Sequence, residues 1–357
     1  MSDRPIHFAV VGLGMGVQHC KDLRDARGCE LVAVCDASPE RLEKNRQEFG
    51  VRAYGSYEEL LRDPDVDVVN ICTPSGTHAD LSIQALRAGK HVVCEKPPDV
   101  SVEAVDRMIA AQRETGRKLM VIFQSRFEPL NREIKAAIDA GRLGRLVGVH
   151  GTVHWYRPES YFDSPGKWKG TWKLDGGGSL ANQGVHTADL VQWLGGPVTE
   201  VYGKFGVFLH DIESEDKTAA VLTFANGALG TLTTTTAAYP GIGRSVFVHG
   251  TRGSILIEDD ELVRWRLQAE SEEAEKAEEQ RMLVEYGKKE RDVSTASDPF
   301  AFAVRLHLKQ FEAMAEAIRT DTPPPNSIET TRHTVEILNA VYESGRTGLP
   351  VKLGPSL

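Results

Sequence analysis

The first 123 residues alternate short apolar runs, rich in β-branched side chains, with longer amphipathic stretches. The apolar runs lie at residues 6–11, 30–35, 66–72, 91–94 and 118–123, with a weaker one at 51–54. Helical spacing fills the intervals 38–49, 56–62, 77–88 and 101–115, and several of these open on a Ser or Thr that can cap a first turn. This order predicts consecutive βαβ units and a doubly wound parallel sheet over residues 1–124.

The pattern changes after residue 123. One helix is expected at 129–140 and one strand at 146–155, followed by an aromatic and glycine-rich stretch to residue 178. Residues 198–267 hold at least five strand-like runs, two of them joined by the hairpin signal Asn226-Gly227, which predicts an antiparallel meander. After a mixed-charge stretch at 270–292, amphipathic helices are expected at 299–319 and 327–344. Residues 125–357 are therefore interpreted as a second domain with a large antiparallel sheet, one face of which can pair subunits.

Charge and cysteine content exclude several classes of partner. With 42 basic and 51 acidic residues the formal charge is -9, which disfavours nucleic acid and anionic membranes and leaves small molecules as ligands. The five cysteines lie in the first hundred residues without a disulfide framework, so reduced thiols and a cytoplasmic location are expected. The sequence shows neither a signal segment nor a run long enough to span a membrane.

A glycine turn follows the first strand, with Gly12, Gly14 and Gly16 around Met15. Such a turn lets backbone N–H groups approach a pyrophosphate at a helix N-terminus. The full G-x-G-x-x-G pattern is absent, because Val17 stands in the place of the third glycine. We expect the turn to contact a dinucleotide.

Asp36 directly follows the second strand, 24 residues after Gly12. A carboxylate there can accept both ribose hydroxyls of NAD and would repel the 2'-phosphate of NADP, although the nearby Ser38 and Arg41 would partly accommodate that phosphate. NAD is therefore the expected cofactor, with NADP possible. The alternative is that Asp36 only caps a helix or stabilises a turn.

Other candidates end strands at the same edge of the predicted sheet, where dinucleotides lie. Thr73, Pro74 and His78 belong to the turn after the strand at 66–72. The alternative is that this segment is only a plain turn before a helix. Gln124, together with Arg126, follows the last strand and is expected either at the nicotinamide or substrate, or at a hinge between domains.

The string Glu95-Lys96-Pro97-Pro98 follows the strand at 91–94. An acidic and a basic side chain fixed by prolines at the end of a buried strand suggest a site, and Glu95 and Lys96 are both placed at the cofactor. Beside a cationic nicotinamide ring and partly desolvated, the lysine would lose its proton more easily and relay one. An exposed structural ion pair is the alternative.

A second string, residues 175–189, reads D-G-G-G-S-L-A-N-Q-G-V-H-T-A-D and places Asn182 and His186 four apart on an expected helix. Together with Glu95-Lys96-Pro97 and the C-terminal Ala340-Val341-Tyr342, it resembles the Gfo/Idh/MocA family of glucose-fructose oxidoreductase and inositol dehydrogenase-like enzymes along the whole chain. The resemblance implies hydride transfer between a nicotinamide and a sugar, sugar derivative or cyclitol carbon. It also implies an N-terminal Rossmann domain over residues 1–124 and, over residues 125–357, a substrate-binding α/β domain with a large, mostly antiparallel open sheet. A homodimer or homotetramer would form through that C-terminal sheet.

By this resemblance Lys96 and His186 act at the substrate hydroxyl, and which of them accepts the proton stays open. Asn182 stands where the family more often has aspartate, so it can orient a hydroxyl but cannot take its proton. The N-Q-G-x-H variant is similar to that of members acting on nucleotide-linked or modified sugars. Two alternatives share the fold: a redox-neutral glycosidase that retains NAD, and a non-enzymatic sugar sensor.

The stretch from Trp155 to Trp172 is dense in aromatic residues, which suit the faces of a sugar. Tyr156, Arg157, Trp168 and Lys169 are the expected pocket residues, alongside Asn182 and His186; packing within the domain is the alternative for each. No metal is expected, since no H-E-x-x-H motif or Cys/His cluster occurs.

Overall fold

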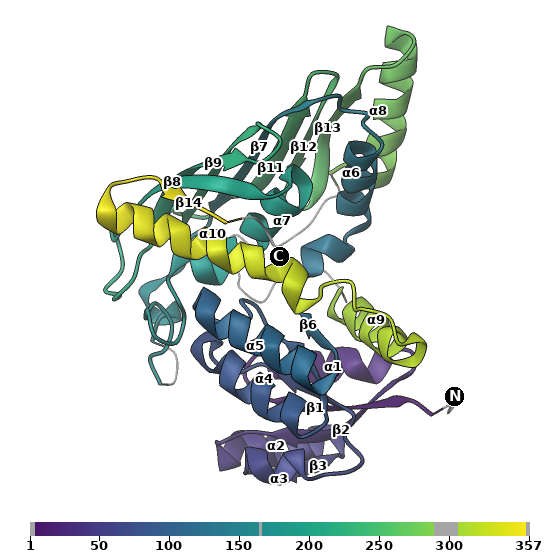
Figure 1. The fold of residues 1–357 in the computed structure, drawn as a ribbon, viewed down its shortest axis with the longest axis vertical. Helices are drawn as coiled ribbons and strands as arrows, with labels where there is room; N and C mark the ends of the chain where they lie inside the picture. Colours follow the sequence, from purple (N-terminus) through teal and green to yellow (C-terminus); the bar gives the residue numbers. More distant parts are fainter. Residues whose placement is uncertain (1–3, 164–165, 289–305, 355–357) are drawn as a thin grey trace. The chain divides into compact units, whose positions relative to one another are not determined.

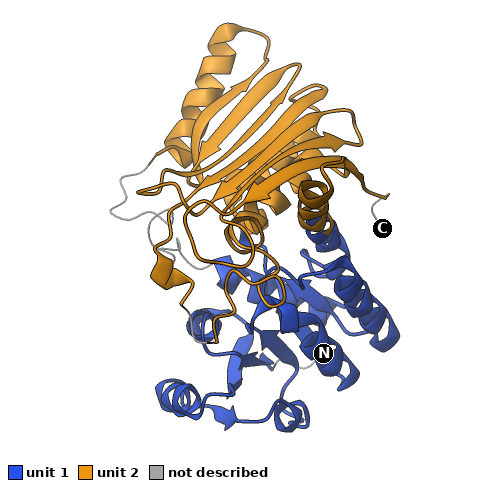
Figure 2. Ribbon diagram, turned by 90° about the vertical axis from the view of Figure 1, so that its left-hand side faces the viewer, with its two compact units in different colours: residues 1–124, 304–335 blue, residues 125–303, 336–357 orange. Residues whose placement is uncertain are grey.

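The computed structural model describes residues 4–163, 166–288 and 306–354. The chain forms two compact units (Figure 2): unit 1 contains Met1–Gln124 and Val304–Val335, and unit 2 contains Ser125–Ala303 and Glu336–Leu357. The first boundary lies at Gln124, but the chain later returns to unit 1, whereas the sequence pattern places everything after residue 124 in the second domain. Among the residues described, no helix combines the length and the apolar character needed to span a membrane.

Unit 1 is built on a six-stranded parallel sheet with the order β3-β2-β1-β4-β5-β6 (Figure 1). Its strands are β1 (Ile6–Val11), β2 (Cys29–Cys35), β3 (Arg52–Tyr54), β4 (Val68–Ile71), β5 (His91–Cys94) and β6 (Leu119–Val121). All six predicted runs are strands, and the doubly wound order is confirmed. The order reverses between β1 and β4, so the carboxyl ends of these strands flank the crevice where such sheets bind ligands.

The helices of unit 1 are α1 (Gly16–Asp25), α2 (Pro39–Phe49), α3 (Tyr57–Leu61), α4 (His78–Arg87), α5 (Val102–Thr115) and α9 (Leu306–Thr320). Helices α2 to α5 follow the four predicted intervals, whereas α1 follows the glycine turn and α9 comes from a stretch expected in the second domain. Ser38, Ser56 and Ser101 cap their helices by accepting a backbone N–H from the first turn, whereas the side chain of Thr77 does not cap α4.

Helix α9 explains the return of the chain to unit 1. Its Phe311 and Met314 are fully buried in one apolar cluster with Phe8 of β1 and Leu23 of α1. The rings of Phe8 and Phe311 meet edge to face with centroids 5.7 Å apart. The amphipathic pattern predicted for residues 299–319 is therefore that of a Rossmann-sheet helix, and its residues 299–305 lie outside the described part of the chain.

Unit 2 contains an eight-stranded sheet with the order β13-β12-β11-β7-β10-β9-β8-β14. Its strands are β7 (Leu146–His154), β8 (Val198–Gly206), β9 (Lys217–Phe224), β10 (Leu229–Thr235), β11 (Gly243–Gly250), β12 (Gly253–Glu258), β13 (Glu261–Leu267) and β14 (Val351–Lys352). All neighbours pair antiparallel except β7 and β10, which run parallel. The hairpin at Asn226-Gly227 is confirmed between β9 and β10, with Gly227 at a φ of 83°.

The prediction of one continuous meander over residues 198–267 is wrong. β10 and β11 do not pair, because β7, which comes earlier in the chain, lies between them and bonds to both. Its Val149 and Val153 are fully buried, as a central strand requires. Two three-stranded meanders, β8-β9-β10 and β11-β12-β13, thus flank a strand that sequence order separates from them.

Helices cover one face of this sheet. They include α6 (Pro129–Asp139), α7 (Val185–Gly195), α8 (Glu272–Tyr286) and α10 (Ile328–Thr347), within which the last boundary between the units falls. α7 lies so close to β7 that a Cβ at Gly151 would stand 2.7 Å from the Thr187 methyl group. The mixed-charge stretch is mainly helix α8, and its residues 289–292 are outside the described part.

The opposite face of the sheet in unit 2 is exposed. Strand register places Tyr202 beside Val221, and Val221 beside Thr231, in one row across β8, β9 and β10. Tyr202 is 41% exposed and Val221 49%, and Leu229 on the same face is 55% exposed. This combination of aromatic, branched and hydroxyl side chains is the face that the sequence predicts to pair subunits.

Candidate functional site

The glycine turn between β1 and α1 has the shape that a pyrophosphate needs. Gly12 has a φ of 90°, and a Cβ there would stand 2.8 Å from the Cys72 carbonyl oxygen, so only glycine fits. Gly14 is exposed, with no heavy atom within 4 Å of the position of a Cβ. The turn therefore leaves open space over the N-terminus of α1, where backbone N–H groups and the helix dipole favour an anion.

Gly16 performs the task of the third glycine in the usual dinucleotide motif. A Cβ on it would stand 2.8 Å from Val10 of β1 and 3.3 Å from Cys72, so its absence lets α1 pack closely on the sheet. The departure from the G-x-G-x-x-G pattern is thus a shift of one residue in the position of the glycine that packs the helix on the sheet. The turn itself is preserved. Met15, at the tip, is 38% exposed.

Asp36 lies at the end of β2 and is almost completely buried. Its Oδ2 accepts the Leu13 N–H at 2.7 Å and its Oδ1 accepts the Ser38 N–H at 2.7 Å, which ties the glycine turn to the start of α2. Arg41 donates to both oxygens, at 3.2 and 2.8 Å. Burial raises the pKa of this carboxyl, but Arg41 and the two backbone N–H groups outweigh burial and hold the pKa below its usual value. Asp36 is therefore an anionic acceptor at the strand end where a ribose is expected.

The turns after β4 and β5 are linked by one histidine. His78, at the start of α4, has Nε2 2.8 Å from the Thr73 carbonyl oxygen and Nδ1 2.8 Å from the Pro97 carbonyl oxygen. Thr73 and Pro74 are partly exposed at this edge, whereas His78 is buried. The structure thus brings together the predicted residues of two strand ends, and His78 holds their backbones.

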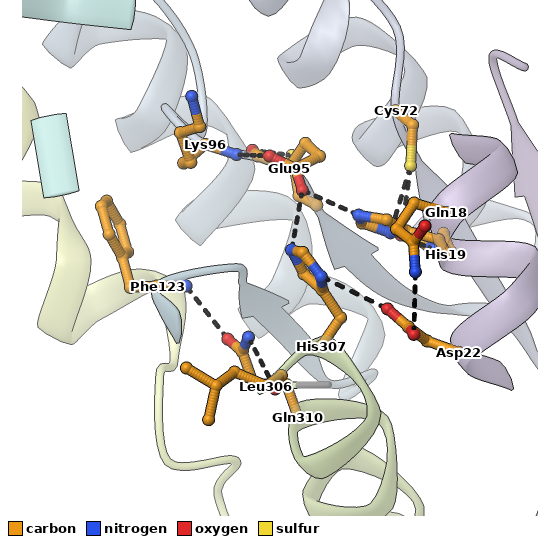
Figure 3. Close-up of polar contacts among 12 residues, drawn as sticks. Gln18, His19, Asp22, Cys72, Glu95, Lys96, Phe123, Leu306, His307 and Gln310 are labelled. Carbon is orange, nitrogen blue, oxygen red and sulfur yellow. Dashed lines mark hydrogen bonds and ion pairs between the residues drawn. The ribbon is translucent and has the colours of Figure 1, made fainter. Parts of the chain in front are cut away.

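Lys96 stands just beyond β5 and is joined to Pro97 by a cis peptide bond. Its N–H donates to Glu95 Oε2 at 3.0 Å, and Glu95 Oε1 lies 2.9 Å from Nε2 of the buried His19 (Figure 3). Burial raises the pKa of the Glu95 carboxyl, but the contact with His19 and the charges of Lys96 and His307 hold it well below its usual value. Glu95 is thus a buried anion beside the backbone of the candidate catalytic lysine.

In unit 2, the loop 175–184 surrounds a carboxylate that sequence reasoning missed. Glu215, completely buried, accepts the N–H groups of Gly178 and Leu180 at 3.0 Å each, the Ser179 hydroxyl at 2.6 Å and the Tyr342 hydroxyl at 2.9 Å. A Cβ at Gly178 would collide with the Glu215 backbone carbonyl. Glu215 therefore shapes the glycine loop. In the sequence, the run of three glycines was the only signal that the loop has such a close neighbour.

The sequence pattern predicts that Asn182 and His186 share one regular α-helix, and this prediction is wrong. Residues Ser179–Gly184 form a π-helical turn, and α7 begins at Val185. Insertions of this type are frequent at functional sites. Asn182 Nδ2 donates to Asp175 Oδ1 at 2.7 Å, and Asn182 Oδ1 accepts the Tyr161 hydroxyl at 3.3 Å, so both ends of the amide are oriented. His186 is 7% exposed, in the first turn of α7.

The aromatic stretch separates into buried and accessible members. Arg157 is 2% exposed, donates to the Tyr156 carbonyl and lies over the ring of Trp155, so it packs within unit 2. Tyr156 and Trp168 are half-buried. Lys169 is half-buried too, with Nζ 3.6 Å above the ring centre of Tyr161, which itself contacts Asn182. Lys169 and Tyr161 thus lie in the same group as Asn182.

Arg126, considered above for the cofactor or a hinge, forms a buried ion pair. Its Nε and Nη2 donate to both oxygens of Asp189 at 2.8 and 2.6 Å, and Asp189 is completely buried in α7. This pair fixes α7 to the segment that follows unit 1. The histidines His150 and His154 point to the exposed sheet face, where His150 Nδ1 lies 2.9 Å from the Thr231 hydroxyl.

Two family models match this chain. Residues 6–123 match an oxidoreductase family with an NAD-binding Rossmann fold, and residues 131–256 match the GFO/IDH/MocA C-terminal domain. The chain belongs to the GFO/IDH/MocA family of oxidoreductases, and its unit 1 carries the NAD-binding Rossmann domain of that family.

Several relatives named as dehydrogenases are similar to this chain over most of their length. The chain is 30% identical to the myo-inositol 2-dehydrogenase of Thermotoga maritima over 71% of this chain and 75% of that protein, and 31% identical to the inositol 2-dehydrogenase of Rhizobium meliloti over 71% and 76%. It is also similar to the WlbA dehydrogenase from Bordetella pertussis, whose structure contains NADH and UDP-GlcNAcA, with 30% identity, 99% of both chains covered and a TM-score of 0.88.

Proposed function

We propose that this protein is an NAD-dependent dehydrogenase that interconverts a hydroxyl-bearing and a carbonyl carbon on a sugar, sugar derivative or cyclitol. The observation that carries the proposal is the full-length similarity to a dehydrogenase crystallised with NADH and a nucleotide sugar, together with a glycine turn and a buried anionic Asp36 at one sheet edge. The intact Lys96 and His186 favour an enzyme over a binding protein.

The cofactor residues proposed are those at the carboxyl edge of the unit 1 sheet. They are Gly12, Gly14, Met15, Gly16, Asp36, Ser38, Arg41, Thr73, Pro74, His78, Glu95, Lys96 and Gln124. Gly12 and Gly14 leave room for a pyrophosphate, and Asp36 offers a carboxylate to a ribose. NAD, when bound there, supplies a hydride acceptor. Arg41 already pairs with Asp36, so a 2'-phosphate would have to displace a carboxylate to use it, and NAD is preferred over NADP.

The proton chemistry is assigned to side chains of the chain itself. Oxidising an alcohol removes its hydroxyl proton, so a base must lie within hydrogen-bond reach of that hydroxyl. Lys96 and His186 are proposed for this task, one as base and the other as the partner that stabilises charge on the oxygen. Asn182, oriented by Asp175 and Tyr161, is proposed to hold a substrate hydroxyl. Tyr156, Trp168 and Lys169 are the remaining pocket candidates, together with Arg157, which is buried and donates to the Tyr156 carbonyl.

The substrate class is tested by following NADH absorbance with a panel of substrates. UDP-GlcNAcA is the first compound, because the WlbA dehydrogenase covers 99% of this chain, and myo-inositol is the second. Growth of NADH with one class identifies the substrate. If the protein binds NAD but no compound of the panel produces NADH, the result would contradict the proposal of a dehydrogenase.

Two substitutions test the residue roles. Lys96→Met should abolish turnover while NADH affinity stays within about threefold, because the side chain is proposed to act on the substrate proton; full activity would refute the role. Asp36→Ala should weaken NADH binding more than NADPH binding, and an unchanged ratio of the two affinities would place the ribose elsewhere.

A second copy of the chain is proposed as the partner of the exposed sheet face in unit 2. Tyr202 and Val221, neighbours in one row, and Leu229 on the same face are apolar side chains that a monomer would leave in water. Light scattering should give a homodimer or homotetramer, and Val221→Lys should shift it toward monomer. A monomeric wild-type protein would refute this surface as an interface.

A further inference from the structure

Helix α9 contacts the ends of two strands of the unit 1 sheet. Gln310 Oε1 accepts the Phe123 N–H at 3.0 Å, just beyond β6, and Asn326 Nδ2 donates to the Phe123 carbonyl at 3.1 Å. His307, three residues before Gln310 on α9, points to the end of β5 (Figure 3). A segment about two hundred residues from these strands therefore supports the backbone that leads to Lys96 and Gln124.

The ring of His307 lies between two carboxylates. Its Nδ1 is 3.4 Å from Asp22 Oδ2 on α1, and its Nε2 is 4.0 Å from Glu95 Oε1. It also lies against the ring of His19, with centroids 4.6 Å apart. Among the described residues, the ionisable groups shown against His307 are thus Asp22 from α1, Glu95 from the end of β5 and His19 from α1 (Figure 3).

Glu95 connects these histidines to Lys96. Its Oε1 faces His19 and His307, while its Oε2 accepts the Lys96 N–H at 3.0 Å. The Glu95 side chain is 12% exposed, so a carboxylate that lost these partners has water within reach. The orientation of the Lys96 backbone therefore depends on what holds Glu95 in place.

Two histidines and a carboxylate also have the composition of a metal site, since their ligand atoms lie within 4.8 Å of one another. The geometry favours a direct contact between histidine and carboxylate. His19 Nδ1 is 2.8 Å from Asn70 Nδ2, an amide donor, so the ring proton lies on Nε2, the nitrogen that faces Glu95 Oε1. The separation of 2.9 Å is also shorter than the gap of about 3.3 Å between ligands of a tetrahedral zinc with bonds of ~2.05 Å.

We propose that His307 is a positioning residue that, through Glu95, fixes the backbone of Lys96 for proton transfer. The catalytic part of this inference rests on the proposed function, because it takes Lys96 as the residue that acts on the substrate hydroxyl. The positioning part concerns unit 1 alone. Neither of the motifs found in the sequence contains His307, and only the return of the chain as α9 brings it to this strand end.

Amide hydrogen exchange measured by NMR on the protein without substrate tests the positioning. Pro97 and Pro98 have no amide, so in the string Glu95-Lys96-Pro97-Pro98 only two amides report, and the Glu95 N–H is held by the Ile71 carbonyl of β4 at 2.9 Å. His307→Leu should speed exchange at Lys96 by at least about tenfold and leave the Glu95 and Val93 amides unchanged. His307→Gln, whose amide nitrogen takes the place of Nε2, should give a smaller increase.

His7→Gln is the matched control, because His7 belongs to β1 of the same unit and its ring contacts Asp65 and Glu30, not Glu95. It should leave Lys96 exchange unchanged. Lys96 exchange within twofold of wild type in His307→Leu would overturn the positioning role. Equal acceleration at Val93 would also overturn it, since that would indicate general loosening of the unit. Stoichiometric Zn²⁺ or Co²⁺ binding that is lost in His307→Leu would overturn it in favour of a metal site.

Activity gives the second readout once a substrate is known. His307→Leu should lower kcat about tenfold or more with KM and NADH affinity within about threefold, His307→Gln should recover part of kcat, and His7→Gln should match wild type. Wild-type kcat in His307→Leu, with faster Lys96 exchange, would refute the catalytic consequence. If no sugar or cyclitol is turned over by any variant, the proposed function fails, while the exchange experiment still decides the positioning.

Discussion

Replacing Glu215 should damage unit 2 in a way that depends on the replacement. In Glu215→Ala the N–H groups of Gly178 and Leu180 and the Tyr342 hydroxyl lose their common acceptor, Oε1. In Glu215→Gln, Oε1 remains for these three donors. The new amide nitrogen then faces the Ser179 hydroxyl, which can turn to donate to Thr234 at 2.8 Å instead.

The magnitudes follow from this inventory of donors. A buried donor left without an acceptor costs about 1–3 kcal/mol. Three such donors in Glu215→Ala give roughly 3–6 kcal/mol if water enters part of the vacated volume. Glu215→Gln loses only charge assistance and should cost about 1–2 kcal/mol.

Urea unfolding followed by tryptophan fluorescence measures this loss in unit 2 specifically. All five tryptophans of the chain belong to unit 2: Trp155, Trp168, Trp172, Trp193 and Trp265. Equal midpoints and slopes for Glu215→Ala and wild type, or a larger loss for Gln than for Ala, would refute the idea that the carboxylate organises the glycine loop.

Three further results are expected. Arg126→Ala should lower the free energy of unfolding of unit 2 by about 3–5 kcal/mol, because Asp189 keeps a buried charge without its bidentate partner; a change below about 1 kcal/mol would contradict this. Burial lowers the pKa of His91 to about 4, while an unfolded histidine binds a proton near pH 6.5, so stability should fall as the pH drops through that window, by at most about 1.4 kcal/mol per pH unit. Unfolding followed by circular dichroism should show this slope in the wild type, and His91→Gln should reduce it, since the half-buried His150 and His154, whose pKa values are also lowered, keep their share. Burial raises the pKa of Cys20 to about 12 and of Cys35 to about 11, so a disulfide reagent at pH 8 should label the native chain slowly and all five thiols after unfolding; rapid native labelling of either would contradict their burial.

Local pattern was sufficient for residues 1–124 because most strands there are apolar runs followed by a helix, and three of these helices begin at a capping serine. Ser38, Ser56 and Ser101 begin helices where the sequence predicts, and the glycine turn with Asp36 lies at a strand end as expected. These features depend on neighbours in sequence, which a reading of spacing can detect.

The features that the sequence did not reveal depend on contacts between distant residues. β7 enters the sheet between two meanders because of pairing over about eighty residues or more, and Glu215 meets the 178–180 loop over some thirty-five. The amphipathic pattern of α9 indicates that the helix has a buried face. It does not indicate which of the two sheets covers that face. The spacing of Asn182 and His186 hid a π-helical turn, since a separation of four residues has the same appearance in both helix types.

The division of unit 1 between two stretches of chain also sets an order of events during synthesis. A ribosome releases every strand of the second sheet except β14 before it releases Phe311 and Met314, which complete the core around Phe8 and Leu23. Until then the nascent first unit presents that apolar surface to its surroundings. A chain stopped at residue 124 would keep it exposed permanently, so chaperone demand and aggregation should be greatest for nascent chains that end before α9.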